Sequence, residues 1–324
     1  MVLRVATDCS GIEAPIWALR SLGVEFEHVW SAESDKRAVK YIKENHNPEV
    51  LFGDPDGPYP EGDITKRDVS VLPEVDLYVA GFPCQPFSHL NTRRKGLADP
   101  DKGNVFFACM DVIRTCRPRY FVLENVKGLL SHDKGRTWRV VQDHLATLER
   151  IGYRVEHRVL NTRLHAGLPQ NRERVYIVGT RAGDIVWPDA IPMAPLLDYI
   201  DWKNPTTDKM PPCVERAMPR LEGSGLVILN TNGFLHKKTK ETYASMNSGR
   251  AGKWCPCLCA SNVFWVLPLH RRLNGSECLR LQGFDPSKLR GLSDSQARFR
   301  AGNSMTVPLL ARLFQGLGIA GGSA

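Results

Sequence analysis

The sequence lacks any run of apolar residues that approaches the roughly 20 needed to span a bilayer, and it contains no internal repeat. Its first residues, Met1 to Arg4, show no secretory signal pattern. It has nine cysteines, an odd number at irregular spacing, which argues against a disulfide scaffold and for a reducing compartment. We therefore expect no membrane partner and no secretion. The expected location is the cytoplasm or nucleoid for a prokaryotic or viral source, and the nucleus for a eukaryotic one.

What the sequence does have is a basic charge balance and enough length for more than one core. Its 324 residues include 43 Lys and Arg against 35 Asp and Glu, a formal net charge of +8. Such a balance suits a polyanionic partner without proving one. The length exceeds what one hydrophobic core usually holds, so we expect one large domain and a smaller one.

The first half alternates short apolar runs with amphipathic helical patterns. Strands are predicted at 2–6, 28–31, 75–80, 120–123, 153–160 and 174–179, and helices at 12–22, 36–46, 105–116 and 137–151. This alternation predicts an α/β fold with a doubly wound, mainly parallel sheet. A nucleotide-like ligand would bind at the carboxyl ends of the strands.

After about residue 180 the pattern changes. Prolines and glycines interrupt any long helix, and basic residues cluster at Lys237, Lys238 and Lys240. This region is predicted to be a small, irregular, strand-rich domain. Helical character returns after Arg271.

The segment from Gly81 to Ser88 reads Gly-Phe-Pro-Cys-Gln-Pro-Phe-Ser and follows a strand-length apolar run. Pro83 fixes the backbone before Cys84, and a loop at the exit of a strand lets a sulfur reach a substrate. Basic residues further along this loop favour thiolate over thiol. The alternative is a buried, inert cysteine, which is common in proteins.

Three further segments suit a nucleotide-like cofactor. The turn Cys9-Ser10-Gly11-Ile12 leads from a strand into a helix and presents backbone N–H groups, although it is not the three-glycine dinucleotide fingerprint. Glu33 ends the second strand, where a carboxylate accepts hydrogen bonds from ribose hydroxyls. Asp63 and Ile64 pair an acceptor with an apolar side chain, as an adenine requires. The alternative for each acid is a solvated surface carboxylate.

Two more segments carry candidate catalytic groups. Glu124 and Asn125 follow the strand at 120–123, and a carboxyl group there can donate a proton. If the chain from 170 to 174 is extended, Arg172 and Arg174 share one face and can hold a carbonyl, a phosphate or Glu124. The alternatives are a structural acid paired with an arginine and a salt-bridged surface strand.

The order of these segments, with Arg272 to Phe284 and Gly302-Asn303-Ser304 after the variable basic region, resembles the cytosine-5 DNA methyltransferase family. The resemblance covers about residues 1–180 and 257–317. It implies a catalytic and cofactor-binding domain at 1–180, a target recognition domain at 181–270 and a return segment at 271–324 that completes the catalytic domain. Double-stranded DNA is the expected partner, bound by a monomer.

The resemblance also implies the chemistry. Cys84 would attack C6 of a flipped cytosine, Glu124 would supply a proton, Arg174 would hold the ring carbonyl and Arg172 would support the loop. The substrate-binding residues would be Pro83, Gln85, Ser88 and Asn125. The cofactor would be S-adenosylmethionine. Its expected contacts are Cys9, Ser10, Gly11, Ile12, Glu33, Asp63, Ile64, Gly81, Val105, Asn303 and Ser304.

Some positions depart from the family pattern, which usually has an aromatic residue at Cys9 and glycines at Glu13 and Ala14. A zinc site is one interpretation of the closely spaced cysteines Cys255, Cys257 and Cys259. Their spacing is not that of a zinc knuckle, so we expect no metal. The main alternative function is the related tRNA cytosine-5 methyltransferase, whose Cys-Phe-Thr signature is missing. A nucleic-acid-binding protein without catalysis and a nicotinamide dehydrogenase are the remaining alternatives.

Overall fold

The computed structural model describes residues 2–83, 87, 96–99, 103–203, 209–221, 223, 225–235, 242–245 and 254–319. The chain forms two compact units: Met1–Leu160, Glu173–Pro188 and Val307–Ala324 make the first, and Asn161–Arg172 with Asp189–Thr306 make the second. The second unit thus takes in 161–172 and part of the return segment. The functional division into 1–180, 181–270 and 271–324 stays a prediction.

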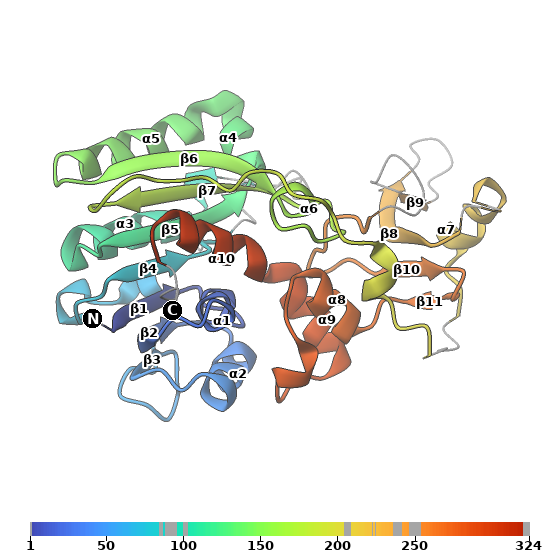
Figure 1. The fold of residues 1–324 in the computed structure, drawn as a ribbon, viewed down its shortest axis with the longest axis horizontal. Coiled ribbons are helices and arrows are strands. Elements are labelled where there is room, and N and C mark those ends of the chain that lie inside the picture. Colours follow the sequence, from blue (N-terminus) through green and yellow to red (C-terminus); the bar gives the residue numbers. More distant parts are fainter. Residues whose placement is uncertain are drawn as a thin grey trace. The chain divides into compact units, whose positions relative to one another are not determined.

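The first unit is built on a seven-stranded sheet (Figure 1). Its strands are β1 (Leu3–Asp8), β2 (Phe26–Ala32), β3 (Val50–Phe52), β4 (Leu77–Ala80), β5 (Tyr120–Val126), β6 (Arg154–Asn161) and β7 (Glu173–Thr180). They lie in the order β3-β2-β1-β4-β5-β7-β6. The pairs from β3 to β5 are parallel, and β7 runs antiparallel to β5. The predicted mainly parallel sheet is confirmed.

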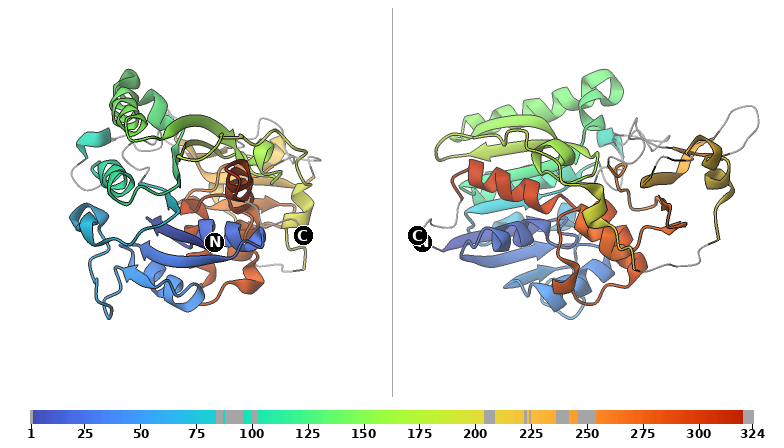
Figure 2. Two further views of the ribbon diagram at one scale, coloured as in Figure 1. Left: turned by 60° about the vertical axis from the view of Figure 1, so that its left-hand side comes forward. Right: turned by 45° about the vertical axis from the view of Figure 1, so that its right-hand side comes forward.

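Helices cover both faces of this sheet. They are α1 (Ala14–Ser21), α2 (Lys36–Asn45), α3 (Val105–Cys116), α4 (Gly128–Ser131), α5 (Arg136–Glu149) and α10 (Val307–Gly316). In the left view of Figure 2, α3 and α5 lie on one face, and α1 and α10 lie on the other. The 3₁₀ turns of this unit are η1 (Ile64–Lys66), η2 (Val69–Val71), η3 (Gly96–Ala98) and η4 (His132–Gly135). The doubly wound arrangement is therefore confirmed as well.

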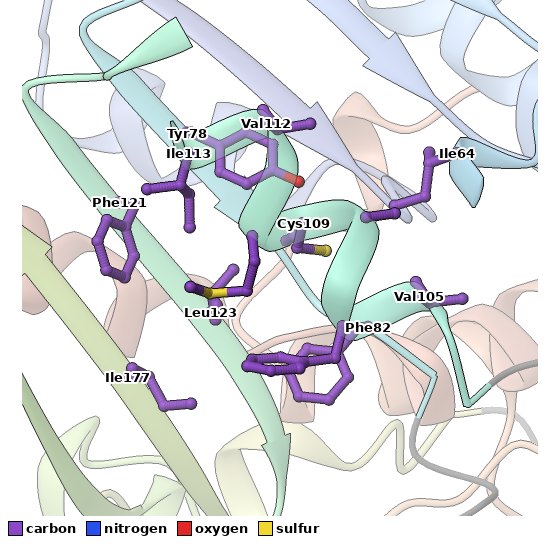
Figure 3. Close-up of a cluster of buried hydrophobic side chains, with 14 of the residues drawn as sticks. Ile64, Tyr78, Phe82, Val105, Cys109, Val112, Ile113, Phe121, Leu123 and Ile177 are labelled. Atoms are coloured by element: carbon purple, nitrogen blue, oxygen red, sulfur yellow. The ribbon is translucent and has the colours of Figure 1, made fainter. Parts of the chain in front are cut away.

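A buried hydrophobic cluster joins α3 to the sheet (Figure 3). Cys109 and Ile113 of α3 face Tyr78 of β4 and Leu123 of β5, all with no exposed area. Full burial of one large apolar side chain contributes about 1.5–3 kcal/mol. This packing fixes the carboxyl ends of β4 and β5, where the candidate catalytic residues lie.

The second unit contains a four-stranded antiparallel sheet in the order β11-β10-β8-β9. Its elements are α6 (Thr162–His165), α7 (Pro212–Glu215), β8 (Val227–Leu235), β9 (Thr242–Ser245), β10 (Phe264–Leu267), β11 (Arg271–Arg272), α8 (Gly275–Leu281) and α9 (Asp294–Asn303), with 3₁₀ turns η5 (Leu196–Tyr199), η6 (Met218–Arg220) and η7 (Pro286–Lys288). Trp265 is fully buried in its core. Arg271 and Glu277 form a buried ion pair at 2.6 Å. The predicted small strand-rich domain is present.

Several predicted boundaries were wrong. Strand β5 continues to Val126, so Glu124 and Asn125 lie within the strand and not after it. The predicted helix at 12–22 begins only at Ala14, because the preceding residues form the turn. The prediction missed β3, which has only three residues. Within the described ranges, no helix has the length and apolar character needed to cross a bilayer.

Candidate active site

The predicted nucleophile loop begins where β4 ends. Cys84, Gln85 and Ser88 lie outside the described residues, whereas Gly81, Phe82 and Pro83 are described. The Phe82 side chain is 2% exposed. Its ring contacts Phe87 edge-on, with centroids 6.3 Å apart, and lies 5.6 Å from the ring of Phe106 in α3. The residues just before Cys84 are therefore anchored in the core.

Asn125 ties β5 to the start of this loop. Its Nδ2 donates a hydrogen bond to the Phe82 carbonyl at 3.0 Å, and its Oδ1 accepts one from the Val126 N–H at 2.8 Å. The side chain has no exposed area. This geometry fixes the backbone two residues before Cys84. The predicted substrate contact of Asn125 stays a prediction.

Glu124 and Arg174 form an ion pair at the same edge of the sheet. Leu123 of β5 lies beside Ala80 of β4, so Glu124 is level with Gly81. In the antiparallel β5–β7 pair, Arg174 lies opposite Val126 and therefore on the face that Glu124 shares. Arg174 Nε lies 3.1 Å from Glu124 Oε1, and both side chains are nearly buried. The predicted pairing of a guanidinium with Glu124 is present.

Arg172 does not share that face, which corrects the sequence prediction. Strand β7 begins at Glu173, and the Arg172 N–H bonds to the Gln170 carbonyl in a tight turn, so the chain there is not extended. The guanidinium donates to the carbonyls of Leu258 (2.8 Å), Gly302 (3.2 Å) and Ser304 (2.7 Å). Arg172 thus holds the backbone of the segment that contains Asn303 and Ser304.

That segment lies in the second unit and is closely packed there. Asn303 ends α9, and Ser304 follows it with 7% of its surface exposed. A Cβ on Gly302 would lie 2.4 Å from the Ala260 nitrogen, so only glycine fits against this backbone. Residues 257–261, which contain Cys257 and Cys259, form no strand. The cofactor role of Asn303 and Ser304 stays a prediction.

The predicted cofactor turn lies at the carboxyl end of β1. Glu33 stabilises this turn, because its carboxylate accepts a hydrogen bond from the N–H of Gly11 at 2.9 Å. The same carboxylate accepts one from the N–H of Asp35 at 2.8 Å. Cys9 and Gly11 both have positive φ, 52° and 58°. Burial raises the pKa of Cys9, so its sulfur stays a neutral thiol and forms part of an apolar wall. The Ser10 backbone N–H donates to the Ala32 carbonyl at 3.2 Å and holds the turn against β2.

The segment with Asp63 and Ile64 packs against Glu33. A Cβ on Gly62 would lie 2.1 Å from the Glu33 carbonyl oxygen, which shows how closely the two backbones approach. Ile64 and Val105 belong to one buried cluster (Figure 3). Cys9 packs against this cluster. The structure thus brings together a carboxylate and an apolar wall, which fit the ribose and adenine of a nucleoside cofactor.

Asp63 begins the 3₁₀ turn η1 by accepting hydrogen bonds from the Thr65 N–H and hydroxyl at 3.1 and 2.8 Å. Burial raises the pKa of Asp63, but the hydrogen bonds from Thr65 and the ion pair with Lys66 outweigh burial and lower that pKa. The carboxylate is therefore ionised at neutral pH and remains an acceptor.

Sequence reasoning missed a buried network beneath this site. The Asp8 carboxylate accepts both terminal nitrogens of Arg67 at 2.9 and 2.6 Å, the Tyr78 hydroxyl at 2.7 Å and the Trp30 indole N–H at 3.3 Å. The network joins β1, β2, β4 and the segment after η1. Asp8 was visible as an acid at a strand end, but nothing in the sequence pointed to its partners.

Comparison with known proteins decides the family. The model of the C-5 cytosine-specific DNA methylase family matches residues 8–211. The Type II methyltransferase M.NlaX of Neisseria lactamica is 36% identical over 293 residues, 87% of this chain and 85% of that protein. The chain belongs to the C-5 cytosine-specific DNA methylase family. It is therefore a DNA cytosine-5 methyltransferase, as the order of its motifs predicted.

Other matches agree with this membership in the methylase family. The Type II methyltransferase M.HaeII of Haemophilus aegyptius is 35% identical, over 88% of this chain and 83% of that protein. The orphan methyltransferase M.Rho11sI of Bacillus phage rho11s is 44% identical, but this chain spans only a third of its length. A crystal structure of Spodoptera frugiperda DNMT2 has a TM-score of 0.66 at 18% identity, covering 98% of this chain and 99% of that one, which shows a shared fold.

Proposed function

We propose that this methylase transfers a methyl group from S-adenosylmethionine to C5 of a cytosine flipped out of double-stranded DNA, through a covalent bond between C6 and Cys84. The carrying observation is the convergence at one sheet edge of three features. These are the Phe82–Pro83 segment before Cys84, the Asn125 hydrogen bond that fixes it, and the Glu124–Arg174 pair. The C-5 cytosine-specific family supports the choice of base and atom.

The Cys84 thiolate would form a bond to C6 of the ring, which makes C5 a carbon nucleophile. Glu124 would hold a proton at N3 and so stabilise the ring that carries the extra electron pair. Arg174, which pairs with Glu124, would donate to the ring carbonyl. Once C5 carries the methyl group, a base takes the C5 proton, and the returning electron pair breaks the bond to Cys84.

S-adenosylmethionine, when bound, supplies a methyl group on a positively charged sulfur. Glu33 would accept the ribose hydroxyls, Asp63 would accept the adenine amino group, and Ile64 with Val105 would pack against the ring. The backbone of the Gly11 turn would face the rest of the cofactor. The other predicted contacts of the cofactor and the substrate belong to the same proposal.

In double-stranded DNA the target base must be flipped out, because the enzyme cannot reach it inside the helix. A cytosine inside a duplex is stacked and paired, so it must leave the helix at a cost of about a few kcal/mol before a side chain reaches C6. The basic residues of 181–270 would contact phosphates and bases. The tRNA alternative is less favoured, because the matching family model is that of a DNA methylase and the relatives include Type II methyltransferases.

Transfer of tritium from labelled S-adenosylmethionine tests the proposal. We expect label in duplex DNA, none in tRNA, and none in DNA with Cys84→Ser. Cys116→Ser at the end of α3 serves as the matched control, because Cys116 lies outside the site, and it should keep the activity. Label in tRNA alone, or full activity of Cys84→Ser, would contradict the proposal.

A further inference from the structure

Glu13 occupies a position in the cofactor turn where a glutamate is unexpected. It has a left-handed backbone, φ 60° and ψ 48°, and its side chain has no exposed area. A non-glycine residue in this region costs about 1–2 kcal/mol. An acidic side chain buried there must also find hydrogen-bond donors. A glycine would avoid both the backbone strain and the burial of a carboxyl group. The glutamate side chain must therefore make interactions that offset these two costs.

The Glu13 carboxyl group is held by an ordered chain of hydroxyl groups. Its Oε1 accepts the Thr7 hydroxyl at 2.8 Å and the Ser31 hydroxyl at 2.5 Å. Since both hydroxyl protons point at Glu13, the Ser10 hydroxyl must donate to Thr7 (2.7 Å), and His28 Nε2 must donate to Ser31 (2.9 Å). One oxygen of Glu13 therefore orders four side chains from β1, β2 and the turn itself.

The same turn carries the predicted cofactor contacts. Ser10 belongs to the hydroxyl chain, and the next residue, Gly11, donates its N–H to Glu33. The backbone alternates into the left-handed region at Cys9, Gly11 and Glu13. The shape of the turn thus depends on contacts made at both of its ends.

We propose that Glu13 is a positioning residue for the cofactor turn: its buried carboxyl group fixes the turn between the carboxyl ends of β1 and β2 in the shape that binds S-adenosylmethionine. This inference rests on the proposed function. Glu13 touches no cofactor atom in this role and acts through Thr7, Ser10 and Ser31. A glycine at this position would leave the Thr7 and Ser31 hydroxyls without their common acceptor.

The surroundings decide the protonation of Glu13. Burial raises the pKa of Glu13 to about 7, against the hydrogen bonds that Ser31 and Thr7 donate to its carboxyl group, and the nearby Glu33 carboxylate raises it further.

Other titratable groups face the Glu13 carboxyl from α1, β2 and α2. The His28 ring, 3.7 Å away, has a pKa that burial lowers to about 3, so it is neutral. Arg20 and Tyr41 face it at longer range. Among the described residues, Glu13 Oε2 has no hydrogen-bond partner, so it is free to carry the proton.

The decisive experiment compares Glu13→Gly with Glu13→Gln in binding of S-adenosylhomocysteine, measured by isothermal titration calorimetry on the full chain. Glutamine keeps an acceptor for Thr7 and Ser31, so we expect a Kd within about threefold of wild type. Glycine relieves the backbone but removes the acceptor, and we expect a Kd raised by at least about tenfold, or about 1.4 kcal/mol. An unchanged Kd in Glu13→Gly would overturn the proposal.

Lys134→Gly is the matched control for backbone relief. Lys134 is exposed, also has positive φ (54°), and lies in η4 away from the cofactor turn. It should bind S-adenosylhomocysteine as the wild type does. In steady-state assays, Glu13→Gly should raise KM for S-adenosylmethionine more than it lowers kcat. A fall in kcat alone would contradict a positioning role.

A readout without ligand covers the case in which Glu13→Gly does not fold. The folded state of the wild type holds the Glu13 proton more tightly than the unfolded state. Its stability therefore falls, relative to Glu13→Gln, as pH rises from about 4.5 to about 7. Parallel pH curves for the two proteins would overturn the buried-carboxyl account. Absence of any binding by the wild type would instead contradict the proposed function.

Discussion

At the scale of single residues, the proposed chemistry depends on the Glu124–Arg174 pair. Glu124→Gln keeps the shape but removes the acid, and general acid–base groups contribute about 10²–10⁴-fold to rate. We expect single-turnover methyl transfer to fall within that range, with S-adenosylhomocysteine binding unchanged. Glu173→Gln is the matched control, because Glu173 is an exposed neighbour that pairs with Lys127. Equal rates for the two variants would contradict the role of Glu124.

Asn125 provides a second test at this scale. Asn125→Ala leaves the Phe82 carbonyl without its partner, and an unsatisfied buried group costs about 1–3 kcal/mol. We expect lower stability in denaturant unfolding. We also expect slower formation of the Cys84 adduct, because the backbone before Cys84 loses its anchor. Wild-type adduct kinetics in a folded Asn125→Ala protein would show that the anchor has no part in catalysis.

The residue scale also shows the limits of sequence reasoning. Glu124, Arg174 and Glu33 were predictable, because each is a polar residue at or beside the end of a strand in a recognisable motif order. The second role of Asn125 was not, since a hydrogen bond to Phe82, 43 positions away, leaves no pattern in the sequence. Glu13 was visible only as a departure from the family.

At the scale of elements, Arg172 links a turn before β7 to the end of α9. Removal of its guanidinium by Arg172→Ala deletes three hydrogen bonds to buried carbonyls, at about 1.5–3 kcal/mol for each hydrogen bond to a charged group. Arg172→Lys should recover part of this stability, because an ammonium lacks the planar fork. The measurement is the free energy of unfolding. Arg298→Ala, a partly exposed control in α9, should change little, and equal losses in the two alanine variants would contradict this assignment.

Elements were predicted well where their signals were local. The helix at 105–116 was predicted with the bounds of α3, because Pro118 follows it and its apolar face packs into the core. The end of β5 was predicted less well. Polar residues end the apolar run after Leu123, whereas the pairing with β7 continues the strand through Glu124 and Asn125.

At the scale of the whole molecule, buried histidines set the response to acid. His28, with a pKa lowered to about 3 by burial, binds fewer protons when folded than when unfolded. Stability should therefore fall as pH drops below about 6.5, with a limiting slope of about 1.4 kcal/mol per pH unit. Glu13 acts with the opposite sign between about pH 4.5 and 7, so the comparison must isolate His28. His28→Asn should flatten the acid limb of the stability curve, and an unchanged limb would contradict this.

The net charge of +8 gives a second prediction at this scale. Lys and Arg that contact phosphates release counterions from DNA, so log Kd for duplex DNA should rise linearly with log salt concentration. S-adenosylhomocysteine carries no phosphate and would release no condensed counterions on binding, so its Kd should depend much less on salt. Fluorescence anisotropy with a labelled duplex measures the first quantity, and calorimetry measures the second. A salt-independent affinity for DNA would contradict an electrostatic role for the basic surface.

The central claim is a transient bond between Cys84 and the C6 atom of a flipped cytosine, and covalent trapping tests it most directly. Fluorine at C5 cannot leave as a cation, so the bond to Cys84 persists after methyl transfer. With S-adenosylmethionine and duplex DNA that contains 5-fluorocytosine in its target site, we predict a denaturation-resistant adduct that peptide mass spectrometry assigns to Cys84. The adduct should be absent with Cys84→Ser. An active enzyme that forms no adduct, or forms it on another side chain, would contradict the account.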